Sequence, residues 1–334
     1  MEFREEKQAS KQYKKSYLEG LDHVIALRQQ EAAARRLDYI KDVFSEPERY
    51  REDLKQMLGW PLTEKKPSTL PHVTQEKLSQ EDGYSIWRMG IEILDGCCMS
   101  GLFFRADGEE KRPLVIVQHG GGGTPELISG VYGDTSNYND MLERVRQYGV
   151  HVFAPQVLLW DKEYEVEYDR KDVDGRLKRV GSSLTAMEVY GITRILDYFE
   201  VQPYVGAFGM VGMSYGGFYT LYTTAIDTRI QSAVSCGFFN SRDAVGWSDW
   251  TWHKSAEKFD DAQVACLVYP RRLCIEIANE DALFDYRRGE ESFDTLTKAC
   301  SQVGTDWVEL IVFDGFHEFC KQDEPLARLV SDLS

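Results

Sequence analysis

Positive charge is scarce in this sequence. Its 39 lysines and arginines stand against 55 aspartates and glutamates, which gives a formal net charge of −16, and no basic run is longer than three residues. A surface of this sign repels the phosphates of nucleic acids and of anionic lipids. We therefore expect a protein that binds neither nucleic acid nor a membrane surface.

Long apolar runs are also missing. No stretch reaches the roughly eighteen uncharged apolar residues of a membrane-spanning helix, and the first residues lack the apolar core of a secretory signal. The seven cysteines are an odd number. Cys97 and Cys98 are adjacent, and Cys236, Cys266 and Cys274 lie in apolar runs, where a reduced cysteine behaves as a small hydrophobic residue. These features predict a cytoplasmic protein.

The common motifs of metal and phosphate sites are absent as well. Residues 317–320 read HEFC and lack the second histidine of H-E-x-x-H, and the cysteine pair at 97–98 has no matching C-x-x-C. The glycine run at 120–123 is not part of a G-x-x-x-x-G-K-[ST] loop. We predict no metal and no other cofactor.

A G-x-S-x-G pattern is present at residues 212–216, with Ser214 at its centre. The apolar run 207–211 before it is typical of a strand, and residues 218–225 after it can form a buried helix. A serine on a sharp turn between strand and helix is a nucleophile elbow, in which the flanking glycines avoid a clash. A simple glycine turn is the alternative.

A serine hydroxyl needs a general base to become a nucleophile at neutral pH. His317 lies just after the predicted strand 308–313, and the carboxyl end of that strand lies at the same edge of the sheet as Ser214. We therefore predict that His317 is the base. His253, in a segment rich in tryptophan, is the alternative.

The base in turn needs a carboxylate that fixes its tautomer. Asp281 lies in the turn that follows the predicted strand 273–278, so it is the expected acid. Glu276 lies inside the strand and Glu280 one residue earlier in the turn, and they remain alternatives. The resulting chain order of serine, acid and histidine is that of hydrolases with a doubly wound sheet.

Two backbone N–H groups should stabilise the oxyanion of a tetrahedral intermediate. Tyr215, directly after the serine, supplies the first. The glycine loop after the predicted strand 114–118 supplies the second, with Gly121 as first choice and Gly120 or Gly122 next. His119, which opens this loop, is expected to form hydrogen bonds within it.

The order of segments predicts the fold. Residues 1–66 have apolar residues at helical spacing, which predicts two or three amphipathic helices that act as a cap packed on the main domain, as a lid or in oligomerisation. Residues 67–334 begin with antiparallel strands and continue as strands alternating with helices. This order predicts an α/β domain with a doubly wound, mostly parallel sheet and helices on both faces. Insertions without regular structure are expected at about 156–181 and 238–269, where ligands bind in such sheets.

Four tryptophans lie in or next to these insertions: Trp160, Trp247, Trp250 and Trp252. Aromatic side chains can form a platform for sugar rings, but they also bury large apolar areas in any core. Both roles are open for these residues.

The motifs HGGGG, GMSYGG, NEDALF and DGFHEF together resemble the α/β-hydrolase superfamily over residues from about 70 to the end. The helical N-terminus, the LGWP turn and the elbow are similar to its dienelactone-hydrolase-like and acetyl-xylan-esterase-like branch. Dienelactone hydrolases proper use a cysteine where this chain has Ser214.

The resemblance implies a serine carboxylic-ester hydrolase, and specifically a carbohydrate acetyl esterase with a small-molecule or oligosaccharide ester as substrate. A peptidase or amidase of the prolyl-oligopeptidase type and a non-catalytic binding protein are the alternatives. The N-terminal helices make a homo-oligomer plausible.

Overall fold

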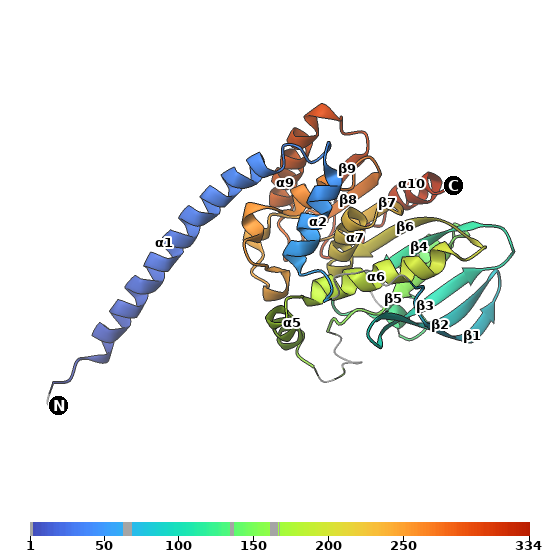
Figure 1. The fold of residues 1–334 in the computed structure, drawn as a ribbon, viewed down its shortest axis with the longest axis horizontal. Coiled ribbons are helices and arrows are strands. Elements are labelled where there is room, and N and C mark those ends of the chain that lie inside the picture. Colours follow the sequence, from blue (N-terminus) through green and yellow to red (C-terminus); the bar gives the residue numbers. More distant parts are fainter. Residues whose placement is uncertain (1–2, 63–68, 134–136, 161–165, 167) are drawn as a thin grey trace.

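The computed structural model describes residues 3–62, 69–133, 137–160, 166 and 168–334. Its centre is a nine-stranded sheet in the order β1-β2-β3-β5-β4-β6-β7-β8-β9 (Figure 1). The strands are β1 (Val73–Glu81), β2 (Tyr84–Leu94), β3 (Cys97–Ala106), β4 (Arg112–Gln118), β5 (His151–Pro155), β6 (Val205–Met213), β7 (Ile230–Cys236), β8 (Arg272–Ala278) and β9 (Val308–Phe313).

Both strand directions occur in the sheet. β1, β2 and β3 form an antiparallel meander, and β3 pairs antiparallel with β5. From β5 to β9 all neighbouring strands are parallel. The carboxyl ends of β6, β8 and β9 therefore meet at one edge of the sheet, where ligands bind in doubly wound folds.

Helices cover both faces of the sheet. In β4, Leu114 and Ile116 belong to one hydrophobic cluster, whereas Val115 and Val117 belong to the other. This alternation follows from the two-residue period of a strand that is buried on both sides. The first cluster is completed by α2 (Pro47–Leu58), α6 (Leu184–Glu200), α7 (Tyr215–Ile226), α8 (Asp261–Cys266) and α9 (Tyr286–Ala299), and the second by α3 (Pro125–Ile128), α4 (Met141–Arg146) and α10 (Glu324–Asp332).

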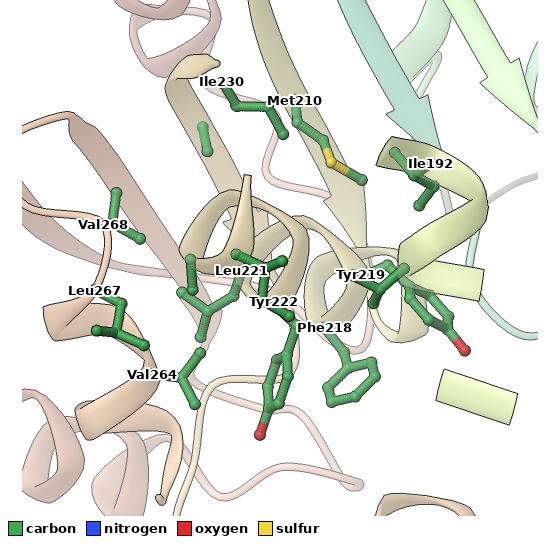
Figure 2. Close-up of a cluster of buried hydrophobic side chains, with 14 of the residues drawn as sticks. Ile192, Met210, Phe218, Tyr219, Leu221, Tyr222, Ile230, Val264, Leu267 and Val268 are labelled. Atoms are coloured by element: carbon green, nitrogen blue, oxygen red, sulfur yellow. The ribbon is translucent and has the colours of Figure 1, made fainter. Parts of the chain in front are cut away.

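The helix after the serine, α7, lies in the middle of the first cluster. All its residues are buried, and Figure 2 shows Phe218, Leu221 and Tyr222 pointing from it into the surrounding apolar side chains. Val264 and Leu267 approach it from the segment around α8. A helix that is apolar all round is stable only inside a core, so the end of α7 that carries the serine is held rigidly.

These observations confirm the predicted fold class. The described part of the N-terminal region holds two helices, within the expected two or three: the 33-residue α1 (Lys7–Tyr39), which reaches the main core through Tyr39, and α2, which is part of that core. Local expectations differ in the two insertions. The two segments expected to lack regular structure contain α5 (Arg170–Arg179) and α8, which are short helices that a weak apolar period did not reveal.

The expected domain boundary at residues 66 and 67 falls outside the described residues, as does part of the insertion at 156–181. Among the helices that the structure describes, none combines the length and the apolar character needed to cross a membrane.

Candidate active site

Ser214 occupies a strained turn between β6 and α7. Its φ of 61° and ψ of −123° lie in a region that residues with a side chain rarely adopt. Its neighbours must be glycines: a Cβ on Gly216 would lie 2.1 Å from the carbonyl oxygen of Gln118, and one on Gly212 would lie 2.4 Å from that of Gly216. The Ser214 N–H donates to the Cys236 carbonyl at 2.8 Å, which fixes the turn against β7.

The structure brings together the three residues predicted as nucleophile, base and acid. Nε2 of His317 lies 2.9 Å from Oγ of Ser214. Nδ1 of the same ring lies 2.7 Å from Oδ2 of Asp281, whose side chain is fully buried. The residues come from loops after β9, β6 and β8, so the meeting of parallel strand ends creates this cluster.

The carboxylate determines how the protons are arranged. An ionised carboxylate only accepts hydrogen bonds, so Nδ1 of His317 must donate to Asp281. Nε2 then carries a lone pair and accepts the hydroxyl proton of Ser214. Asp281 is itself held in place, because its Oδ1 accepts the backbone N–H groups of Leu283 at 2.7 Å and Phe284 at 3.2 Å. In this arrangement His317 can take the hydroxyl proton of Ser214.

The alternative residues lie elsewhere. Glu276 is buried inside the sheet, and Glu280 is exposed, its backbone bonded to Gly315. His253 is exposed in the loop after Trp252. His119 is buried in the glycine loop, with Nδ1 3.0 Å from the Gly120 carbonyl and Nε2 accepting from the Val157 N–H. The bond to Gly120 lies within the loop, as expected, whereas the bond from Val157 ties the loop to the segment after β5.

The glycine loop presents one backbone amide without a hydrogen-bond partner among the described residues. The Gly120 N–H donates to the hydroxyl of Tyr138 at 2.7 Å, the Gly122 N–H to the Trp160 carbonyl, and the Gly123 N–H to the Gly120 carbonyl. Within the described part of the chain, Gly121 is the only glycine of this run whose N–H has no acceptor. The Tyr215 N–H is also without an intrahelical partner, because it opens α7.

Three of the four tryptophans lie beside the ring of Tyr215, and the buried Trp250 has the shortest centroid distance, 4.4 Å. Trp247 stacks on the Tyr215 ring with ring centroids 5.4 Å apart, and Trp160 meets it edge-on at 5.2 Å. Trp160 is 44% exposed and its ring lies directly against Gly121. A pocket of about 260 Å³ opens between Trp160, Tyr215 and residues of α5.

Of the two roles left open by the sequence, Trp250 and Trp252 have that of core packing and are not substrate contacts. They are only 2% and 6% exposed and both stack on Phe218 of α7. Buried rings cannot offer a face to a sugar, so these two tryptophans are packing residues beneath the site. Sequence alone did not distinguish them from Trp160, because aromatic residues serve both purposes.

A buried ionic network behind Tyr215 was not foreseen. Nε of Arg170 donates to Oδ2 of Asp249 at 2.8 Å, and the same oxygen accepts the Tyr215 hydroxyl at 2.7 Å. Arg170 also bonds to Tyr219 and pairs with Glu188. Burial, followed by the Asp249 charge, raises the pKa of Tyr215, so its hydroxyl stays protonated and donates.

This network joins both insertions to the residue that follows the serine. Arg170 belongs to the first insertion and Asp249 to the second. A buried charge is tolerated only when it is paired and hydrogen-bonded. Loss of Arg170 would leave Asp249 and Glu188 without their cation, and loss of Asp249 would leave Arg170 with Glu188 alone. Arg170 and Asp249 are therefore positioning residues for Tyr215.

A second buried carboxyl lies under the loop that carries His317. Glu276 of β8 lies next to the thiols of Cys236 and Cys320, and burial raises its pKa to about 7. One of its oxygens has no hydrogen-bond partner in the described structure. Among the residues that the structure describes, no group of histidine, cysteine and acidic side chains is placed to hold a metal.

Replacing Glu276 with glutamine should change how stability depends on pH. Between the ordinary pKa of 4.5 and about 7, the folded protein keeps a proton that the unfolded chain has released, so wild-type stability falls as pH rises. Glutamine does not titrate. We expect the free energy of unfolding of Glu276→Gln, relative to that of wild type, to rise by on the order of 3 kcal/mol from pH 4 to pH 8. Urea unfolding at both pH values measures this, and an equal difference at the two pH values contradicts it.

Comparison with known proteins supports the fold. Sequence comparison finds no matching family model and no matching curated protein. The chain is similar in structure to an acetyl xylan esterase from Paenibacillus sp. R4, with a TM-score of 0.56 and 17% identity over 90% of this chain and 99% of that one. It is also similar to acetyl xylan esterase 1 from Thermoanaerobacterium sp. JW/SL YS485 (TM-score 0.58, 15% identity, 86% and 93% covered).

A glucuronoyl esterase from Solibacter usitatus gives a similar match, with a TM-score of 0.58 and 15% identity over 85% of this chain and 91% of that one. At such low identity these likenesses establish the architecture. The chain has the α/β-hydrolase fold, and the resemblance stated from its motifs is confirmed at the level of the fold.

Proposed function

We propose that the protein is a serine carboxylic-ester hydrolase that removes acetyl groups from carbohydrates in the cytoplasm. The observation that carries the hydrolase assignment is the chain of two hydrogen bonds, 2.9 Å from Ser214 to His317 and 2.7 Å from His317 to Asp281. The same geometry recurs in unrelated enzymes that form acyl-enzymes, so it is recognised by its arrangement of groups.

The reaction follows from the positions of these groups. Oγ of Ser214 attacks the ester carbonyl while Nε2 of His317 takes its proton, and His317 then protonates the leaving alcohol. The negative charge on the tetrahedral oxygen is met by the free N–H groups of Tyr215 and Gly121. Asp281 orients the imidazole and stabilises its cation. Water activated by His317 then hydrolyses the acyl-enzyme.

The carbohydrate assignment rests on a different observation. Trp160 offers an exposed aromatic face next to the Gly121 amide, and Trp247 extends the aromatic surface on the other side of Tyr215. Sugar rings pack their C–H faces on such surfaces. The fold is shared with esterases that are named for acetyl xylan and for glucuronoyl esters.

Replacing Trp160 with alanine should weaken the binding of sugar esters and leave the hydrolysis of an ester without a sugar almost unchanged. We expect the KM for peracetylated xylo-oligosaccharides to rise about fivefold, since one stacking contact contributes about 1 kcal/mol. Hydrolysis of p-nitrophenyl acetate, which has no sugar, should change by less than about threefold. Acetate release and p-nitrophenol release are the two measurements.

The matched control is Trp87→Ala, which removes a partly buried tryptophan from β2 at the far side of the sheet. It should leave both KM values as in wild type. If the wild-type protein cleaved the aryl ester but not acetylated sugars, the hydrolase assignment would stand and the carbohydrate assignment would be wrong. Preferential cleavage of peptide p-nitroanilides would favour a peptidase.

A further inference from the structure

The first 22 residues of α1, which we call the arm (residues 7–28), project away from the body of the molecule (Figure 1). At 1.5 Å per residue the arm is about 33 Å long. Its residues from 10 to 28 are all exposed. The remainder of α1, residues 29–39, is its base and packs on the body.

The base is firmly attached. Ala32 is buried, and Tyr39 packs edge-on against Tyr50 and Phe259. Arg36 forms a 3.3 Å ion pair with Asp260, and both side chains are nearly buried. The direction of the arm is therefore set by the body.

The arm itself lacks the features that would stabilise a helix alone in water. No side chain caps its first turn. Gly20 lies in its middle, where glycine disfavours a helix. Lys15 and Glu19 make a fully exposed ion pair, a kind of contact that contributes little. Most helices in proteins depend on the packing of an apolar face, so a covering partner is required.

The arm has such a face. Leu18 and Ile25 continue a seven-residue repeat with Ala32 and Tyr39 of the base, and Leu21 lies between them. Residues with this spacing form one seam along a helix. Large apolar side chains on the arm are between 40% and 71% exposed: Tyr13, Tyr17, Leu18, Leu21, Val24, Ile25 and Leu27.

The charge of the arm indicates what covers this face. Residues 7–18 contain four lysines and no acidic or other basic residue. The whole chain carries −16 and this segment +4, so all other residues together carry −20. The basic tip is held away from its own acidic body, which leaves the acidic surface of a second copy as its natural counterpart.

We propose that the arms of two copies of this chain pair in antiparallel orientation about a two-fold axis and form a homodimer. Each apolar face then covers the other, and each basic tip lies beside the partner's acidic body. Glu31 and Asp38 of the base and Glu48 of α2 are exposed there, each also paired with a basic side chain of its own chain. A parallel pair would place two +4 tips together and two acidic bodies together. The antiparallel pair is isologous and closed, as in most dimers.

The central test introduces charge into the seam. Leu21→Glu combined with Ile25→Glu should raise the dimer dissociation constant by about 100-fold or more. Far-UV circular dichroism should show a loss of helix confined to the arm. The matched control, His23→Glu with Gln30→Glu, adds the same charge to the opposite face and should remain a dimer. Sedimentation equilibrium of the full chain measures both variants.

A second variant tests the orientation. Replacing Lys7, Lys11, Lys14 and Lys15 with glutamine should weaken an antiparallel dimer about tenfold and remove much of its salt dependence, since attraction between tip and base is lost. A parallel pair would become tighter, because its tips repel, and that result overturns the proposed arrangement.

Three further results would overturn the proposal. One is a wild-type chain that stays monomeric at all concentrations. Another is a dimer unaffected by the two glutamates in the seam. The third is a monomer that floats with vesicles of anionic phospholipid, which would assign the arm to a membrane surface. None of these measurements depends on ester hydrolysis, so the proposed function can fail or stand separately.

Discussion

Ser214→Ala is expected to lower kcat/KM for p-nitrophenyl acetate by about 10⁵-fold while leaving the fold intact. The oxygen that His317 contacts at 2.9 Å would be gone, and no acyl-enzyme could form. The residual rate would come from the oxyanion amides and from substrate binding alone. The strained backbone at position 214 tolerates alanine as well as serine, since both carry a Cβ.

Initial rates and the melting temperature of the two proteins provide the measurement. Ser232→Ala is the matched control, because this buried serine of β7 bonds to Asp332 and not to His317. It should retain activity within about threefold. Activity that survives in Ser214→Ala would show that another group carries out the reaction and would discard the proposed mechanism.

Asp281→Asn is expected to lower kcat by about 10⁴-fold with little change in KM. An asparagine amide can donate to Nδ1 of His317, which would leave the imidazole in the tautomer with its proton on Nε2. That proton would face the hydroxyl of Ser214, so His317 could not act as a base. The loop should keep its shape, because the amide oxygen can still accept from the Leu283 N–H.

Glu280→Gln removes a charge from the adjacent position and serves as the control. Glu280 is exposed and does not contact His317, so its kcat should match that of wild type. Steady-state kinetics of both variants above and below the KM separate kcat from binding. If Glu280→Gln were the more damaging change, the acid would have been assigned to the wrong turn residue.

The site residues that could be predicted from the sequence are those whose positions depend on neighbouring residues or on the strand that precedes them. Gly212 and Gly216 were predictable because a Cβ at either position has no space, which is a property of five consecutive residues. Asp281 and His317 followed from their positions just after strands whose ends must meet in a parallel sheet. Gly121 was distinguished from its neighbours only by the hydrogen bonds that occupy the other amides.

What sequence reasoning missed depends on contacts between distant segments. Arg170 and Asp249 are 79 positions apart and lie in insertions without a clear apolar period, so nothing local indicates that they pair. Trp250 and Trp252 were candidates for ligand contacts because burial is not encoded in the residue type. The apolar spacing of the N-terminal region indicated its helices, but not that the first of them runs for 33 residues and stands largely exposed.

The salt bridge between Arg170 and Asp249 also limits how this fold can be modified. The first insertion brings the cation and the second brings the anion. A designer who replaced the first insertion alone would leave Asp249 and Glu188 without their cation in the protein interior, and one who replaced the second alone would remove the acceptor of the Tyr215 hydroxyl. We therefore expect the two insertions to be exchangeable only as a pair, and homologues should gain or lose them together.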